Sequence, residues 1–153
     1  MYDNRILGGI VGDIIGSTRE RKNVKTEDFE LLPQGSRFTD DTVMTLAVAQ
    51  WLMTDPDHTE AGLVKCMQYL GRRYPDVGYG GMFRKWLKSE NPQPYGSFGN
   101  GSAMRVSPIG WLFGCENEVR KQAELSAAIT HNHPEGIKGA VAAATAIFRM
   151  RTE

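Results

Sequence analysis

The sequence has few cysteines, few histidines and no excess of charge of either sign. Its 153 residues include two cysteines and three histidines, and 18 basic residues balance 18 acidic ones. Cys66 and Cys115 are isolated, without a CxxC pair, which excludes a disulfide framework and zinc-finger spacing and favours two reduced thiols. The balanced charge gives no reason to expect nucleic acid or an anionic membrane as a partner.

Long apolar runs are also lacking. No run reaches the ~18 residues that span a membrane, and the amino terminus lacks the basic segment and apolar stretch of a secretory signal. We therefore predict a cytoplasmic protein with no membrane partner. The length suits one ordinary domain, so residues 1–153 are predicted to form a single domain.

No segment shows the sustained period-two alternation that is typical of strands. Apolar residues instead recur with helical spacing, and several segments begin with capping residues or proline. The helices are expected at residues 6–15, 43–53, 59–74, 82–87, 107–113, 116–130 and 134–151. A charged connector covers residues 18–34, and residues 91–101 have the proline and glycine content of a loop. The predicted fold class is all-α.

The first of these helices is unusually rich in glycine. Gly8, Gly9, Gly12 and Gly16 alternate with large apolar residues. Each glycine costs a helix about 1 kcal/mol relative to alanine, so the pattern predicts close contact with another element or a ligand, and a central position in the fold. Asp13, on the same helix, is expected to be paired or close to a site.

Two adjacent aspartates stand at the start of the second helix, in the stretch FTDDTVMTLA. The simplest interpretation is a helix start, in which Thr39 or Asp40 caps backbone amides and the carboxylates favour the positive end of the helix dipole. One carboxylate is enough for that role. The second, Asp41, must be solvated, paired or bound to a cation. Neighbouring carboxylates and a hydroxyl are hard oxygen ligands, which suit Mg²⁺, Ca²⁺ or Mn²⁺.

Two loops are further candidates. In FGNGSAMR, glycines around Asn100 would let backbone amides approach phosphates, although such a motif alone is most often a turn. In THNHPE, we expect His133 to start a capped helix. A ligand contact for His131 is plausible only if its loop faces the glycine loop.

Four motifs in this order, GGIVGDIIGSTRE, TDDTVMTLAVA, GNGSAMRVSPIG and ITHNHPEGIKGAVAAATAI, give the chain a resemblance to a known family. It resembles the N-terminal portion of the ADP-ribosylglycohydrolase family, which includes the dinitrogenase reductase-activating glycohydrolases. The resemblance implies an all-α orthogonal bundle. It also implies a centre of two Mg²⁺ ions, with Mn²⁺ as an alternative, that removes ADP-ribose from a modified side chain or small molecule.

The resemblance also assigns residues. It implies metal ligation by Thr39, Asp40 and Asp41, catalytic roles for Glu20, Asp40 and Asp41, and binding of the ADP-ribosyl substrate by Gly99, Asn100, Gly101, Ser102, Met104 and His131. Glu20 could be a general base or a gate, and the sequence does not choose between them. The linkage that is cleaved also stays open.

One feature departs from the family pattern. The family has a second metal motif, Asp-Xaa-Asp-Thr or -Ser, in its C-terminal half, and no such stretch follows Thr42. We therefore expect a fold truncated relative to the family, which a second chain or a C-terminal portion would complete. The alternative function is a non-catalytic ADP-ribose-binding module or assembly subunit. A phosphohydrolase of the His-Asp type is disfavoured because the sequence has no His-Asp dipeptide.

Overall fold

The computed structural model describes residues 6–20 and 25–153, so residues 1–5 and part of the predicted connector lie outside it. The described residues form helices and no strand, which confirms the all-α prediction. The elements are α1 (Leu7–Gly16), α2 (Asp40–Thr54), α3 (Glu60–Arg73), α4 (Gly81–Lys88), the 3-10 turn η2 (Asn100–Ser102), α5 (Ser107–Leu112), α6 (Glu116–Ala128) and α7 (Pro134–Thr152). None of the described helices combines the length and apolarity needed to cross a bilayer.

Side-chain caps and prolines define the starts of several helices, as the sequence predicts. The Thr39 side chain accepts a hydrogen bond from a backbone amide at the start of α2, and Thr59 does so for α3. At α7 the cap is His133, whose side chain accepts from the Glu135 amide, and Pro134 is the first helical residue. Each cap satisfies one of the backbone amides that a helix start leaves without a partner.

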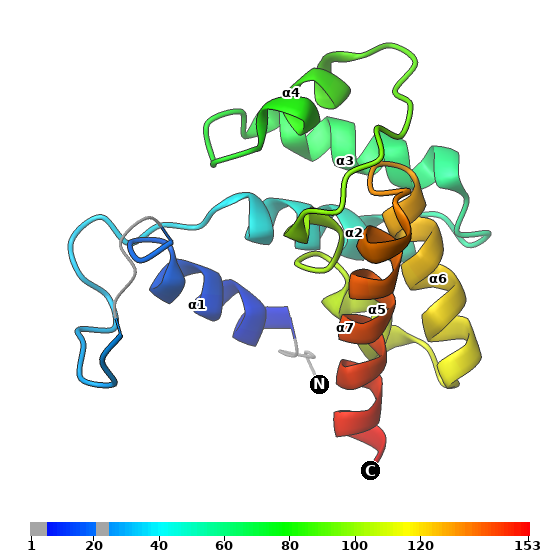
Figure 1. Ribbon diagram of the computed structural model, residues 1–153. Helices are drawn as coiled ribbons and strands as arrows, with labels where there is room; N and C mark the ends of the chain where they lie inside the picture. Colours follow the sequence, from blue (N-terminus) through cyan, green and yellow to red (C-terminus); the bar gives the residue numbers. More distant parts are fainter. Residues whose placement is uncertain (1–5, 21–24) are drawn as a thin grey trace.

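The centre of the fold is α2, which is buried on both flanks as predicted. Nine of its residues are buried, including Met44, Val48 and Trp51. It packs against α3 and α5, while α6 packs along α7 (Figure 1). Gly110 lets α5 approach α7, because a side-chain carbon there would lie 2.7 Å from the Ala144 carbonyl oxygen. The helices around α2 thus form one continuous apolar core.

The prediction that the glycine-rich helix is central is wrong. Helix α1 stands to one side of the other helices (Figure 1), and none of its residues is buried. Leu7 and Val11 are each 51% exposed. The expected close contact with another element is absent too, because a side-chain carbon built at any of the four glycines of α1 would meet nothing within 4 Å. Three of them, Gly9, Gly12 and Gly16, instead line a cavity between α1 and α2.

Candidate functional site

Asp13 of α1 holds the start of α2. Its carboxylate accepts hydrogen bonds from the backbone amide and the hydroxyl of Thr39, at 2.8 Å and 2.6 Å, and from the amide and hydroxyl of Thr42. These four bonds give the buried hydroxyls of Thr39 and Thr42 a charged partner. They also explain how a helix without buried residues is attached to the fold, since hydrogen bonds to a charged group are stronger than neutral ones.

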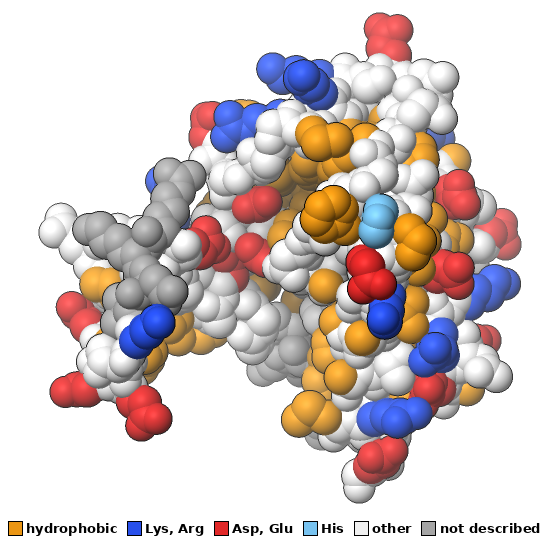
Figure 2. All heavy atoms as spheres, in the orientation of Figure 1, with side chains coloured by type: hydrophobic (Ala, Val, Ile, Leu, Met, Phe, Trp, Pro, Cys, Tyr) orange, Lys and Arg blue, Asp and Glu red, His pale blue; other side chains and the backbone are white. Residues whose placement is uncertain are grey.

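The same carboxylate belongs to an acidic cluster. Asp13, Glu20 and Asp41 each offer a carboxylate oxygen, and these oxygens all lie within 4.8 Å of one another. They line a cavity of about 290 Å³ between α1 and α2, together with glycines of α1. Figure 2 shows acidic side chains meeting in the hollow between the α1 region and the other helices. Such a set supplies only hard oxygen donors, the ligands that Mg²⁺, Mn²⁺ and Ca²⁺ prefer.

The two adjacent aspartates point to different places. Asp41 joins the acidic cluster, whereas Asp40 lines a second cavity on the other side of the start of α2. Burial, together with the charges of Asp41, Glu20 and Asp13, raises the pKa of Asp40 to about 6, against the opposing effect of its backbone hydrogen bond. Burial also raises the pKa of Asp41, to which the charge of Asp13 contributes. The neighbouring negative charges therefore oppose ionisation of Asp40 and Asp41, and a bound cation would favour it.

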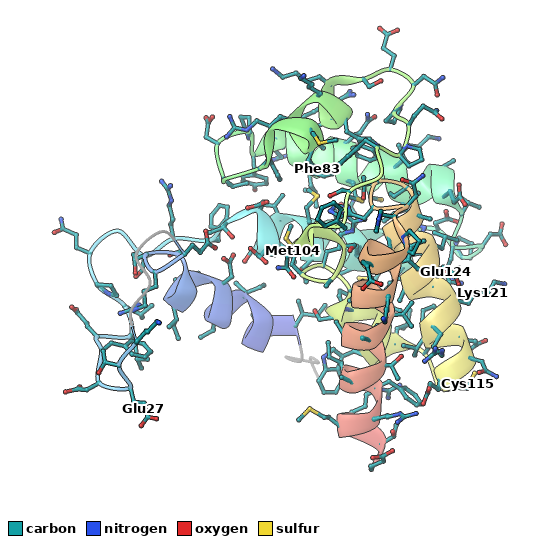
Figure 3. The ribbon with its side chains drawn as sticks, viewed as in Figure 1. Glu27, Phe83, Met104, Cys115, Lys121 and Glu124 are labelled. Atoms are coloured by element: carbon teal, nitrogen blue, oxygen red, sulfur yellow. The ribbon has the colours of Figure 1, made fainter. Side chains whose placement is uncertain are left out.

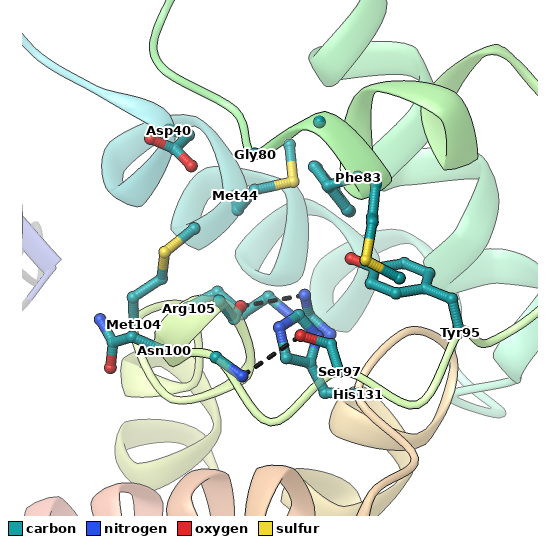
Figure 4. A pocket seen from close by; sticks show the side chains of 14 residues that line it. Asp40, Met44, Gly80, Phe83, Tyr95, Ser97, Asn100, Met104, Arg105 and His131 are labelled. Carbon is teal, nitrogen blue, oxygen red and sulfur yellow. Dashed lines mark hydrogen bonds between the residues drawn. The ribbon is translucent and has the colours of Figure 1, made fainter.

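The second cavity, of about 390 Å³, is where the glycine loop lies. Of the residues predicted to bind substrate, five line it, namely Gly99, Asn100, Gly101, Met104 and His131 (Figure 4). Its volume is within the range of small-molecule pockets, which begins at roughly 300 Å³. Asp40 lies across this space from the loop (Figure 4), so the cavity brings together parts of three of the sequence motifs.

Ser102, the sixth predicted substrate residue, does not line this cavity. Its side chain is 1% exposed, and its hydroxyl donates to the Gly136 carbonyl oxygen at 2.8 Å. A side-chain carbon at Gly136 would lie 2.6 Å from the Ser97 carbonyl oxygen, so the loop and the start of α7 are in close contact. Ser102 therefore ties the glycine loop to α7, a role that the motif alone did not indicate.

The histidine loop faces the glycine loop, which was the condition for a ligand contact by His131. A side-chain carbon at Gly101 would lie 3.0 Å from Cε1 and Nε2 of His131. The His131 side chain lines the glycine-loop cavity, and its ring lies 5.9 Å from that of Tyr95. Burial, with the nearby charge of Arg105, lowers the pKa of His131 to about 4. The ring is therefore neutral at physiological pH.

The two cavities meet at Met104. This residue lines both of them, and its side chain extends from the loop after η2 toward α2 (Figures 3 and 4). The acidic cluster and the glycine loop are thus adjacent, with the start of α2 and Met104 between them.

Comparison with known proteins identifies the family of the chain. A model of the ADP-ribosylglycohydrolase family matches residues 4–152. The chain belongs to this family. It is 30% identical over 175 residues to ADP-ribosylhydrolase ARH3 from Gallus gallus, covering 93% of this chain and 48% of that protein. It is similarly 30% identical over 172 residues to ADP-ribosylhydrolase ARH3 from Bos taurus, covering 93% and 47%.

An uncharacterized protein from Archaeoglobus fulgidus is 29% identical over 165 residues, covering 95% of this chain and 54% of its own length. The chain thus spans about half the length of the curated relatives it matches. The predicted resemblance to the ADP-ribosylglycohydrolase family is confirmed.

The sequence analysis gave Asp13 no specific role in this site and missed Arg105. Asp13 was expected to be paired or near a site, and it is both, since it caps α2 and belongs to the acidic cluster. Its position inside GDIIG, on a helix with only glycine and apolar neighbours, was the available signal. Arg105, at the end of the glycine motif, is 1% exposed and hydrogen-bonded behind the loop. No signal distinguished it from an ordinary surface arginine.

Proposed function

We propose that this chain carries the ADP-ribose pocket and one side of the metal centre of a Mg²⁺-dependent ADP-ribosyl hydrolase. The observation that carries the proposal is the adjacency of the acidic cluster and the glycine-loop cavity across Met104. A hydrolase that acts on an ADP-ribosyl group must hold an anionic diphosphate and a ribose while activating water at the anomeric carbon. Two adjoining cavities of different chemistry can divide these tasks.

The acidic cluster is the proposed metal site. Carboxylate oxygens of Asp13, Glu20 and Asp41 within 4.8 Å of one another can share one cation, and the Thr39 hydroxyl, 3.1 Å from Asp41, could add a neutral oxygen. Asp40 would reach a second ion from the cavity side. Mg²⁺ takes six oxygen ligands at about 2.1 Å and usually keeps several waters, so these residues would supply only part of each coordination shell. Mn²⁺ would suit the same ligands.

The glycine-loop cavity is the proposed site for ADP-ribose. Gly99, Asn100 and Gly101 expose backbone at the cavity wall, where amides can approach diphosphate oxygens. The His131 and Tyr95 rings lie at the side of the same space and offer flat surfaces to a ribose or a base. Met104 lies at the boundary between this cavity and the acidic cluster. The distal ribose would be the part of ADP-ribose nearest to Asp40.

Hydrolysis forms a bond between a water oxygen and the anomeric carbon of the distal ribose, and breaks the bond from that carbon to the modified group. The modified group leaves with the electron pair of that bond and takes up a proton, so the net reaction adds one water. A bound cation would orient ribose hydroxyls and lower the pKa of water. Asp40, whose pKa is raised to about 6, is placed to accept a hydrogen bond from a ribose hydroxyl. The carboxylate of Glu20, on the exposed side of the acidic cluster, is the proposed acceptor of the water proton.

The test is release of ADP-ribose from peptides that carry the modification on arginine or on serine, with Mg²⁺ or with EDTA. The proposal predicts release that depends on Mg²⁺ and is lost in Asp40→Asn and Asp41→Asn. ADP-ribose binding without release, unaffected by EDTA and by Asp41→Asn, would instead support the non-catalytic binding module. Absence of both binding and release would contradict the two functions together.

We further propose that a second polypeptide segment completes the metal centre and covers α1. Helix α1 has no buried residue, with Leu7 and Val11 half exposed, although its sequence is mostly apolar or glycine. An apolar helix in this position is typical of an interface. Sedimentation velocity at increasing concentration tests whether a second copy supplies that cover. Association that Val11→Asp prevents would support a second copy, and a monomer at all concentrations would exclude it.

A further inference from the structure

A chain of hydrogen bonds connects the buried Arg105 to His131. The guanidinium of Arg105 donates to the Gly101 carbonyl oxygen at 3.0 Å, to the Ser126 carbonyl oxygen, and to the Thr130 hydroxyl at 2.9 Å. That hydroxyl lies 2.7 Å from Nδ1 of His131. Arg105, Thr130 and His131 are all buried. This chain of hydrogen bonds therefore joins buried groups at the wall of the glycine-loop cavity, which both Arg105 and His131 line.

The direction of the bond between Thr130 and His131 follows from the acceptors within reach. The Thr130 hydroxyl proton has two, Nδ1 of His131 at 2.7 Å and the Ala127 carbonyl oxygen at 3.5 Å. That carbonyl oxygen already accepts the backbone amides of Thr130 and His131, at 3.1 Å and 2.7 Å. The hydroxyl oxygen, in turn, accepts from Arg105, which is always a donor. The hydroxyl proton therefore points at Nδ1, which must be unprotonated to receive it.

The ring proton of a neutral His131 is then on Nε2. A doubly protonated ring is opposed by burial and by the charge of Arg105, which together lower the pKa of His131 to about 4. Nε2 forms no hydrogen bond within the part of the chain that the structure describes, and it lies on the side of Gly101 at the glycine-loop cavity. A donor directed into this space can bond to water or to an acceptor oxygen of a bound ligand.

Arg105 adds a positive charge close to His131. None of the ion pairs among the described residues involves it, and its bonds are to carbonyl and hydroxyl oxygens. Burial lowers the pKa of Arg105 to about 10, so it stays protonated at neutral pH. A buried cation without a carboxylate partner favours an anion nearby.

We infer that Arg105 and Thr130 are positioning residues that fix His131 as the Nε2-protonated tautomer, so that His131 donates a hydrogen bond to an anionic oxygen of the ligand. The inference deepens the proposed function and rests on it for the identity of the ligand, ADP-ribose, whose diphosphate would supply the anionic oxygen. It assigns His131 the role of a fixed donor, and neither general base nor metal ligand.

Imidazole NMR tests the tautomer directly in the ligand-free protein. Long-range ¹H–¹⁵N correlation distinguishes a protonated ring nitrogen from an unprotonated one, and the chain has only three histidines. We expect His131 to show protonated Nε2 and unprotonated Nδ1 in the wild type and in Thr130→Ser, which keeps the hydroxyl. Thr130→Val, of the same shape, should give a mixture of tautomers. The His133 signals, which arise from an exposed ring, serve as the internal reference.

Binding of ADP-ribose provides the second readout. Loss of one well-oriented donor should weaken binding about five- to tenfold in Thr130→Val and leave Thr130→Ser close to the wild type. Arg105→Lys, which cannot make the same set of bonds, should resemble Thr130→Val in the NMR spectrum if it folds.

Protonated Nδ1 in the wild type, or equal spectra for Thr130→Val and Thr130→Ser, would overturn the inference. If His131 shows the expected tautomer but the protein does not bind ADP-ribose, the positioning role is upheld and the proposed ligand is overturned.

Discussion

Replacing Asp40 by asparagine should stabilise the metal-free protein at neutral and alkaline pH. The pKa of Asp40 rises from 3.8 to about 6 on folding, chiefly through burial. Each pKa unit corresponds to about 1.4 kcal/mol, so the full shift would cost about 3 kcal/mol. Because Asp40 is only partly buried, solvent screening reduces this to about 1–2 kcal/mol. Asparagine keeps a similar shape and avoids that cost.

The sign of the pH dependence follows from the raised pKa. The unfolded chain loses this proton near pH 4 and the folded protein near pH 6, so ionisation of Asp40 lowers the free energy of unfolding progressively over that interval. Below pH 4 the group is protonated in both states and contributes nothing. The advantage of Asp40→Asn should therefore be absent at pH 4, grow up to about pH 6, and stay constant above it.

Urea denaturation followed by tryptophan fluorescence, in EDTA at pH 4 to 8, measures this difference. Asp57→Asn, at an exposed position outside both cavities, is the matched control and should change the free energy of unfolding by less than about 0.5 kcal/mol. Asp40→Asn that is less stable than the wild type at pH 8 would refute the reasoning. So would a difference in the free energy of unfolding from the wild type that is the same at pH 4 and pH 8.

Three further predictions concern the two cavities. Mg²⁺ at one hundred times its Kd should raise the free energy of unfolding of the wild type by about 2.7 kcal/mol in urea denaturation, and that of Asp41→Asn by much less. An equal increase in both proteins would place the cation elsewhere. Asp13→Asn should destabilise the metal-free protein by about 2–3 kcal/mol, because it removes the charged acceptor of four hydrogen bonds. If urea denaturation in EDTA shows no loss of stability, this capping role is excluded. Gly101→Ala should weaken ADP-ribose binding at least about tenfold in calorimetry, since its new carbon would lie 3.0 Å from His131 atoms. Gly80→Ala, at a cavity position where the added carbon meets nothing within 4 Å, is its control, and equal effects would argue against a tight loop.

The sequence predicted most of the helices because their signals are local. Thr39, Thr59 and Pro134 begin helices in the structure as their residue types indicate, and the apolar spacing of residues 43–52 correctly predicts that α2 is buried on both flanks. Such signals depend on neighbours within a turn or two of helix. The order of the motifs also identified the family, which the comparisons confirm.

What the sequence could not show depends on how distant elements pack. The glycines of α1 predicted a central helix, yet they line a cavity, because glycine fits equally well beside a cavity and in a close contact. Likewise, nothing local shows that Asp40 and Asp41 face different cavities, or that Ser102 is bonded to Gly136. These placements follow from the packing of α1 against α2 and of η2 against α7.

The central claim is that ADP-ribose bound in the glycine-loop cavity, with its distal ribose beside Asp40, is coupled to a cation at the adjacent acidic cluster. Calorimetric titration of the chain with ADP-ribose, in Mg²⁺ and in EDTA, tests this claim most directly. The account predicts that Mg²⁺ tightens binding at least about tenfold, a coupling free energy of about 1.4 kcal/mol. An ADP-ribose affinity that is the same with and without Mg²⁺ would contradict it.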